Sequence, residues 1–250
     1  MPLNSLAQRI LKNVIVEFED KRIIRRTRRR ISIDYVLDRI LHVLTTGSQW
    51  SHLEVKGGSW KTIYHYFIKW SNAHLFQKAY HHLLSVYFKI NPLSERVVVD
   101  TSFIKNVFGR DCVGPSPFDR GRKATKVSAL VDKNGIPLVF TFHKGNRNDS
   151  RTLEHTLSKC PFNLQGLMLY ADKIYDSEHC YTILTRFGLK SAISKKKQIV
   201  KENKKRIIVE HTFSWLDKFR RIILRYDAKI IHLRSFHYLA MLQIVSGRIR

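Results

Sequence analysis

Cysteine is scarce in this sequence, and its spacing excludes several classes of protein. The three cysteines, Cys112, Cys160 and Cys180, lie far apart and form no C-x-x-C pair. This argues against a disulfide framework and against a cysteine-rich zinc site. We expect three reduced thiols, mostly buried.

Long apolar runs are also missing. Stretches such as Leu239 to Val245 are far shorter than the ~20 residues that a membrane-spanning helix needs. The first residues of the chain have neither a long apolar run nor a small-residue cleavage site. We therefore expect no membrane crossing and no secretion, and an intracellular location in the cytoplasm or nucleoid, or in the nucleus of a eukaryote.

Negative charge is the third deficit. Twenty Asp and Glu residues stand against 45 Lys and Arg, which gives a formal net charge of +25. So large an excess indicates a polyanionic partner, with nucleic acid ahead of an anionic membrane. Two dense basic clusters are candidates for contact with DNA phosphates, although the first also fits a solvated tail. Their residues are Arg25, Arg26, Arg28, Arg29 and Arg30 in KRIIRRTRRR, and Lys195, Lys196 and Lys197.

The N-terminal part has the periodicity of helices. Apolar residues between 33 and 44 recur at helical spacing, with Ser32 as a candidate N-cap and Gly47 near the end. A second helix is expected after Ser59, and a third between residues 76 and 87. This predicts a small, basic helical unit over residues 1–92. It fits a helix-turn-helix-like DNA-binding unit, and it fits equally well a small bundle that supports a neighbouring domain.

Residues 93–250 have a mixed α/β pattern. Strands are expected at 96–101, 126–131, 136–142, 167–171 and 191–194, with a hairpin turn over Asp132–Gly135. Helices are expected at 148–159 and 177–187, around Glu210 and beyond Arg234. This order predicts a mixed five-stranded sheet flanked by helices.

Three acids in this domain are candidates for metal binding. Asp100 and Asp172 each end an apolar strand, where ligands bind in α/β sheets, and Glu210 lies on the polar face of a helix. Singly, each aspartate fits a turn cap or an ion pair, and Glu210 fits a surface pair with Arg206. Together, three carboxylates would form an oxygen site for Mg²⁺ or Mn²⁺. Asp176 is the rival second acid, but its position at a helix start suits capping better.

Several segments resemble the DDE transposases of insertion sequences, in the branch related to PIF/Harbinger elements. VVVDTSFIK, LYADKIYDS and RIIVEHTFSWLDKFRRIILRYD are similar to the segments that carry the three catalytic acids of that family, at Asp100, Asp172 and Glu210 here. Arg206 matches the arginine four residues before the glutamate, and GRKATKVSALVDKNGIPLVFTFHKGNRNDS resembles the family's hairpin. The likeness extends over most of the chain.

The resemblance implies an RNase H-like fold and a divalent-metal-dependent enzyme that cleaves and joins DNA. The implied partners are duplex DNA at transposon ends and target sites, with at least a homodimer on DNA. Ile174, Asn203 and Asp217 depart from the family pattern. The departures keep two alternatives open: a transposase-derived DNA-binding protein without catalysis, and a metal-dependent nuclease. We assign no role to His211, and we expect Tyr175 and Trp215 to pack in the core rather than stack on bases.

Overall fold

A computed structural model describes residues 3–21, 31–194 and 203–249 of the chain. The chain forms two compact units. Unit 1 comprises Met1–Ile90, Leu216–Ile223 and Ile231–Arg250, and unit 2 comprises Asn91–Trp215 and Leu224–Ile230. The first boundary lies close to the predicted one at residue 92, but the C-terminal helix belongs to unit 1. The DNA-binding and catalytic roles of the two parts stay predictions.

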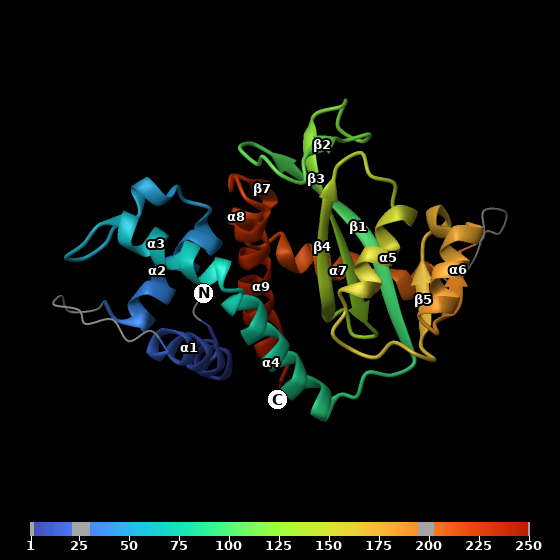
Figure 1. Cartoon of the computed structure of the whole chain (residues 1–250), viewed down its shortest axis with the longest axis horizontal. Helices are drawn as coiled ribbons and strands as arrows, with labels where there is room; N and C mark the ends of the chain where they lie inside the picture. Colours follow the sequence, from blue (N-terminus) through green and yellow to red (C-terminus); the bar gives the residue numbers. More distant parts are fainter. Residues whose placement is uncertain (1–2, 22–30, 195–202, 250) are drawn as a thin grey trace. The chain divides into compact units, whose positions relative to one another are not determined.

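Unit 1 is helical in the part that the structure describes. The three predicted helices are present, and the structure adds a helix at the N-terminus that we did not predict. The elements are α1 (Ser5–Asp20), α2 (Ile33–Thr46), η1 (Trp50–His52), α3 (Trp60–Asn72), α4 (Leu75–Ile90), α8 (Arg220–Ile223) and α9 (Ile230–Ser246) (Figure 1).

Local sequence accounts for where these helices begin and what they bury. The Ser59 side chain caps α3 by accepting a hydrogen bond from the Lys61 N–H at 3.2 Å. Ser32 stands at the start of α2 but makes no side-chain cap. Helix α9 is buried on nearly all sides, because its aromatic residues meet those of the N-terminal helices: Phe236 lies 4.5 Å from Phe67, centroid to centroid.

Unit 2 holds the sheet and the helices that accompany it. Its elements are β1 (Arg96–Asn106), β2 (Gly114–Pro115), β3 (Lys123–Asp132), β4 (Pro137–Lys144), α5 (Ser150–Ser158), β5 (Met168–Ala171), η2 (Lys173–Tyr175), α6 (Glu178–Arg186), β6 (Lys190–Ile193), α7 (Asn203–Leu216) and β7 (Leu224–Arg225). The five predicted strands correspond to β1, β3, β4, β5 and β6. β1 continues five residues beyond its predicted end at Thr101.

The sheet has seven strands and mixed direction. β3 lies between β4 and β1 and is antiparallel to both, whereas β1, β5 and β6 are parallel neighbours. The two-residue strands β2 and β7 pair with β3 and β1 and account for the difference from the five strands predicted. The order β4-β3-β1-β5-β6 is that of an RNase H-like sheet, so the predicted mixed α/β fold is confirmed.

Helices lie on both faces of this sheet. Thr156 of α5 donates a hydrogen bond to Ser128 of β3 at 2.9 Å, and its hydroxyl lies 2.7 Å from that of Thr141 in β4. Figure 1 shows α5 in front of the strands and α7 behind them. Helix α7 approaches the β3–β4 turn closely, since Thr212 donates to the Gly135 carbonyl at 2.7 Å.

Candidate active site

Asp100 and Asp172 lie at corresponding points beyond a paired position of two neighbouring parallel strands. Val98 of β1 pairs with Tyr170 of β5; Asp100 lies two residues further along β1, and Asp172 directly follows the end of β5 at Ala171. Adjacent strands lie about 4.8 Å apart, and side chains two residues apart share a face. Asp172 keeps an extended backbone, with φ −70° and ψ 163°. From this register we infer that the two side chains lie on the same face of the sheet.

The two carboxylates are also held in the same way. Oδ1 of Asp100 accepts the N–H of Thr101 at 2.8 Å, and Oδ1 of Asp172 accepts the N–H of Lys173 at 2.6 Å. Both side chains are half-buried. Because Thr101 pairs with Ser128, which contacts α5, the alternation along β1 directs Asp100 to the opposite face, where α7 lies.

Glu210 is placed differently from the two aspartates. It lies in α7, and its side chain is exposed. The buried side of α7 is formed by Val209, Thr212 and Leu216. Within the described ranges, no three His, Cys, Asp or Glu side chains lie close enough together to hold a metal ion. Like-charged carboxylates repel one another without a cation, and the role of Glu210 stays a prediction.

The donor chemistry of the two aspartates fits a hard divalent cation. Mg²⁺ and Mn²⁺ prefer carboxylate oxygens to nitrogen or sulfur ligands. Asp100 and Asp172 supply such oxygens from rigid, adjacent strands, while the three cysteines lie elsewhere in the chain. None of the three cysteines forms a disulfide; Cys180 is buried, but Cys112 and Cys160 are only partly buried, which corrects our expectation for these two.

Asp176 does not cap the following helix, contrary to our prediction. Ser177 stands at the N-cap of α6, and its hydroxyl accepts the N–H of Cys180 at 3.4 Å. Asp176 instead accepts the hydroxyl of Tyr181 at 2.8 Å. This hydrogen bond is the largest cause of the raised pKa of Tyr181.

Tyr175 is a buried residue near Asp100 and Asp149. Only 1% of its surface is exposed, so its predicted place in the core is confirmed. Burial raises the pKa of Tyr175, and the carboxylates of Asp149 and Asp100 raise it further. The phenol therefore stays protonated beside the acids. Trp215, the other aromatic residue considered, is half-buried and lies close to Gly135.

Sequence reasoning missed a buried ion pair on β3. The ammonium group of Lys126 contacts the carboxylate of Asp149 and the carbonyl of Arg147, and it lies 4.9 Å from the centre of the Phe103 ring. Only 4% of Lys126 is exposed. A lysine within an apolar strand was the available signal, because such a side chain needs an anionic partner when it is buried.

A cationic cavity of about 700 Å³ opens beside this ion pair. Lys144, Arg147 and Arg151 contribute its positive charge, and His143 and His155 contribute two rings 5.1 Å apart. Burial, together with the positive charges nearby, lowers the pKa of His143 to about 4. His143 is therefore uncharged at neutral pH.

The basic residues that the sequence suggested as DNA contacts cannot be placed relative to this site. Arg25, Arg26, Arg28, Arg29, Arg30, Lys195, Lys196 and Lys197 lie outside the described residues. Arg206 lies in α7, but its side chain is also outside the described part. Their contacts with DNA stay predictions. None of the helices described has the length and apolar character that a lipid bilayer requires.

The family model described as "Transposase DDE domain" matches residues 93–242, and the chain belongs to this family. A second model, "Putative transposase of IS4/5 family", matches residues 9–80. The predicted resemblance to DDE transposases is thus confirmed.

A relative from Burkholderia cepacia, described as "Putative transposase for insertion sequence element IS402", is 32% identical over 133 residues. The match covers 49% of this chain and 63% of the relative, which is less than two thirds of the relative's length.

Two solved structures are similar at low identity. The catalytic domain of Mos1 mariner transposase is 13% identical, with 69% of this chain and 91% of that chain covered and a TM-score of 0.31. The Mos1 transposase paired-end complex with left transposon end is 12% identical, with 94% and 86% covered and a TM-score of 0.30. Because these TM-scores are low, the fold assignment depends on the strand order and the family match.

Proposed function

We propose that this protein is a DNA transposase that cleaves DNA strands at the ends of a mobile element and joins them to target DNA. The observation that carries the proposal is that Asp100 and Asp172 each lie two residues beyond Val98 and Tyr170, a paired position of the adjacent parallel strands β1 and β5. The match of residues 93–242 to the DDE family supports it. The relation to PIF/Harbinger elements is part of the proposal, whereas the model matched by residues 9–80 is described as an IS4/5 family transposase and the relative as an IS402 transposase.

The proposed cofactor is Mg²⁺ or Mn²⁺, with Asp100, Asp172 and Glu210 as the residues that would hold it. Bound divalent ions stabilise the charge that develops on phosphate oxygens during phosphoryl displacement. The chain's own contribution is orientation, because strand backbones and the hydrogen bonds from Thr101 and Lys173 position the two aspartates. Tyr175 adds a protonated, uncharged group near Asp100.

The proposed partner is duplex DNA, at transposon ends and at the target. The net charge of +25 supports a strong electrostatic component. Arg25, Arg26, Arg28, Arg29 and Arg30, the cluster Lys195, Lys196 and Lys197, and Arg206 are the proposed phosphate contacts. Two transposon ends require at least a homodimer on DNA, and the reaction places the protein inside the cell with the DNA.

A second candidate function is DNA binding without catalysis. The exposed position of Glu210 favours it, as does the lack of a three-residue metal cluster among the described side chains. Ile174, which replaces a family glycine, is 45% exposed near the acids. A metal-dependent nuclease is the third candidate, and it would yield cut DNA without joined product.

A comparison of two aspartates tests the proposal. Asp172→Asn should abolish Mg²⁺-dependent strand cleavage, because it removes a carboxylate oxygen from the paired position. Asp176→Asn should leave cleavage measurable, because the Asp176 carboxylate accepts a hydrogen bond from Tyr181 and lies beyond the residues that pair β5 with β1. The assay is cleavage of a labelled duplex that carries the element's own terminal repeats, with joining to a plasmid as a second readout. If Asp172→Asn cleaves DNA as well as the wild-type chain does, DNA binding without catalysis becomes the better-supported function.

A further inference from the structure

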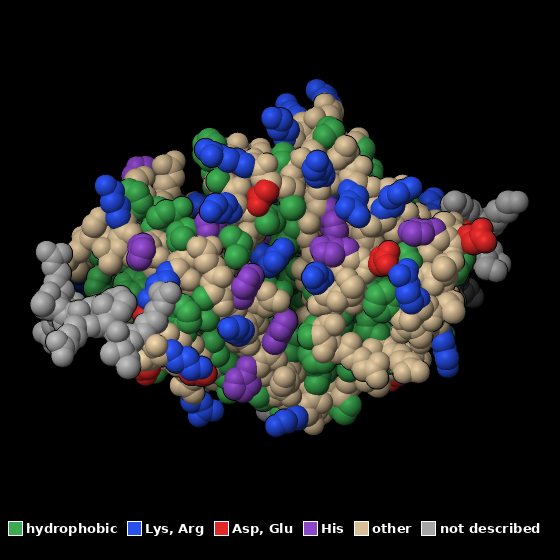
Figure 2. Space-filling view, in the orientation of Figure 1, with side chains coloured by type: hydrophobic (Ala, Val, Ile, Leu, Met, Phe, Trp, Pro, Cys, Tyr) green, Lys and Arg blue, Asp and Glu red, His purple; other side chains and the backbone are tan. Residues whose placement is uncertain are grey.

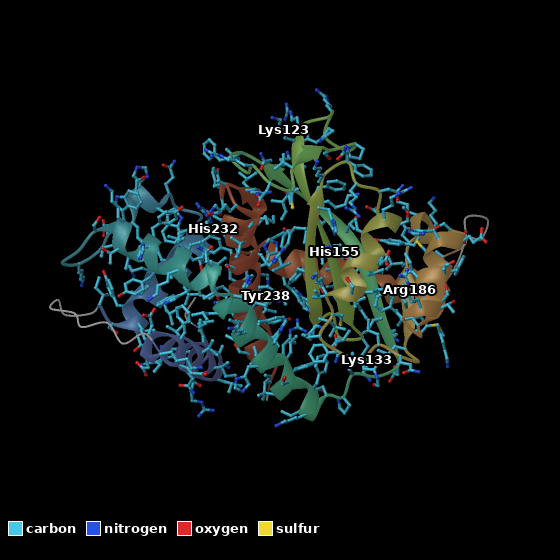
Figure 3. All side chains as sticks on the ribbon, in the orientation of Figure 1. Lys123, Lys133, His155, Arg186, His232 and Tyr238 are labelled. Atoms are coloured by element: carbon cyan, nitrogen blue, oxygen red, sulfur yellow. The ribbon has the colours of Figure 1, made fainter. Side chains whose placement is uncertain are left out.

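A projection between β1 and β3 has a chemistry that the catalytic proposal does not use. We define it as residues 105–123; it includes β2 and extends from the end of β1 that lies beyond Asp100. It contains two acids, Asp111 and Asp119, and five exposed cations. The cations are Lys105, Arg110, Arg120, Arg122 and Lys123. Figure 2 shows Lys and Arg side chains gathered at the top of the molecule, over this segment, and Figure 3 labels Lys123 there.

Large apolar side chains are exposed among these cations. Phe118 is 78% exposed and Phe108 is 65% exposed. The Phe118 ring lies edge-on to the ring of Phe103, with 5.4 Å between the ring centroids. An aromatic ring held in water by a hydrogen-bonded turn has its apolar surface available to a ligand.

The backbone holds Phe118 and its neighbours in a fixed turn. The N–H of Ser116 donates to the Arg122 carbonyl at 2.8 Å, and the N–H of Gly121 donates back to the Ser116 carbonyl at 3.1 Å. Arg120 adopts φ 48°, an uncommon value for a residue with a side chain. A turn that is already ordered loses little entropy when it binds.

The acids of the projection do little to offset its charge at the tip. Asp111 is paired with the buried Arg225. Asp119 lies 3.8 Å from Lys105 and 4.0 Å from Arg122, which are long contacts between exposed groups. Such exposed ion pairs contribute little stability, so a stronger anion can replace Asp119 as the partner of these cations. The tip therefore combines an aromatic ring with several cations around it.

We propose that the projection is a DNA-contacting element in which Arg120, Arg122 and Lys123 bind phosphates while Phe118 wedges against the bases of the same duplex. Apolar side chains flanked by basic residues are used in this way to unstack a base step. A second copy of the chain would bring the same positive charges together, so it fits this surface less well. The inference rests on the proposed function, because it needs DNA as the partner.

The role of Phe118 is tested with full-length chains that all carry Asp100→Asn, the substitution expected to prevent DNA cleavage. A duplex with 2-aminopurine reports unstacking as a rise in fluorescence on binding. We expect Phe118→Ala to remove this rise and weaken binding about 10-fold, since stacking on an aromatic ring contributes ~1–3 kcal/mol per base. Phe118→Trp should keep both effects. Ile90→Ala, at an exposed apolar residue of unit 1, is the matched control.

The charged part is tested by the salt dependence of affinity. Replacing Arg120, Arg122 and Lys123 by Gln should reduce the slope of log K against log salt by about 2.7, or 0.9 for each phosphate contact. The matched variant replaces three exposed cations elsewhere in unit 2, Lys159, Arg186 and Lys190, and should keep the slope.

The outcomes separate this inference from the proposed function. If the parent chain binds duplex DNA while the Phe118 and projection variants behave like their controls, the projection is not a DNA element and the transposase proposal is unaffected. If Phe118→Ala instead dissociates a dimer and leaves the 2-aminopurine signal unchanged, the projection is a protein contact. A parent chain that does not bind duplex DNA would overturn both.

Discussion

Arg225 holds the base of the projection, and its replacement by lysine gives a sharp prediction. Its side chain is fully buried, with 0% exposed. Each of the five guanidinium N–H groups has an acceptor. Nε donates to the Asp227 carbonyl at 3.1 Å, Nη1 to the Asp111 carbonyl at 2.5 Å and to Thr125 Oγ1 at 2.7 Å. Nη2 donates to the Ala228 carbonyl at 3.1 Å and to the Asp111 carboxylate.

Arg225→Lys keeps the charge but has three donors in place of five. At least two acceptors then lose their partners, and each buried, unsatisfied polar group costs about 1–3 kcal/mol. Since the Asp111 side chain is 47% exposed, water can replace part of the loss. We expect the structure around β1, β3 and β7 to lose about 2–4 kcal/mol of stability.

Amide hydrogen exchange followed by mass spectrometry measures this loss locally, which suits a chain with two compact units better than one global unfolding transition. The expected change is a roughly 30- to 1000-fold decrease in protection for peptides from β1 and β3. Arg122→Lys is the matched control, because that side chain is 72% exposed and should change stability by less than about 0.5 kcal/mol. Equal protection in the two variants would refute the argument.

Three further predictions concern stability and DNA affinity. Glu19→Ala should destabilise unit 1 by about 3–5 kcal/mol in urea denaturation, because Glu19 binds Lys69 at 2.6 Å and Trp70 Nε1 at 3.0 Å in a buried site. Glu17→Ala removes only an exposed pair with Lys21 and should leave the urea midpoint nearly unchanged; similar losses in the two variants would contradict this. Burial lowers the pKa of His143 and His237 to about 4. The unfolding free energy should therefore have its highest value above pH ~6.5 and decrease as the pH falls toward ~4. Each histidine should contribute at most about 1.4 kcal/mol per pH unit to that decrease. Replacing both histidines by Gln should make the unfolding free energy less dependent on pH over this range. If the double variant keeps the wild-type pH dependence in urea denaturation, these histidines are not the cause of it. Deleting residues 21–30 should flatten the salt dependence of duplex binding, which otherwise changes affinity by ~10³-fold or more between 50 and 200 mM salt, and an unchanged slope would mean that the segment makes no phosphate contacts.

Much of the sheet was predictable because its signals are local. The Asp132–Gly135 turn is one example: Gly135 adopts φ 79°, and an added Cβ would lie 3.0 Å from Trp215 and 3.1 Å from Ile208. A turn that needs positive φ and close approach of a helix favours glycine. The end of β5 before Asp172 was predictable for the same reason, since an apolar run stops there. The end of β1 was not, because the strand continues past Asp100 to Asn106.

Other features depend on contacts between distant residues, which a single sequence does not reveal. The burial of Arg225 follows from acceptors at Thr125 and Asp111, which lie 100 and 114 residues away along the chain. Helix α9 shows little apolar periodicity, because it is surrounded by other helices, and its place in unit 1 could not be inferred from pattern alone. The position of Glu210 relative to the two aspartates is of the same kind, and its role stays a prediction.

The membership of α9 in unit 1 has a consequence for how the protein is made. Residues 1–90 leave the ribosome well before Phe236 and Tyr238, the aromatic partners that Phe67 and Tyr80 require. The apolar faces of the N-terminal helices therefore stay uncovered while about 150 further residues are synthesised, a period of some 7–30 s at ordinary rates of translation. A truncated product that lacks α9 would keep those faces exposed to chaperones and proteases.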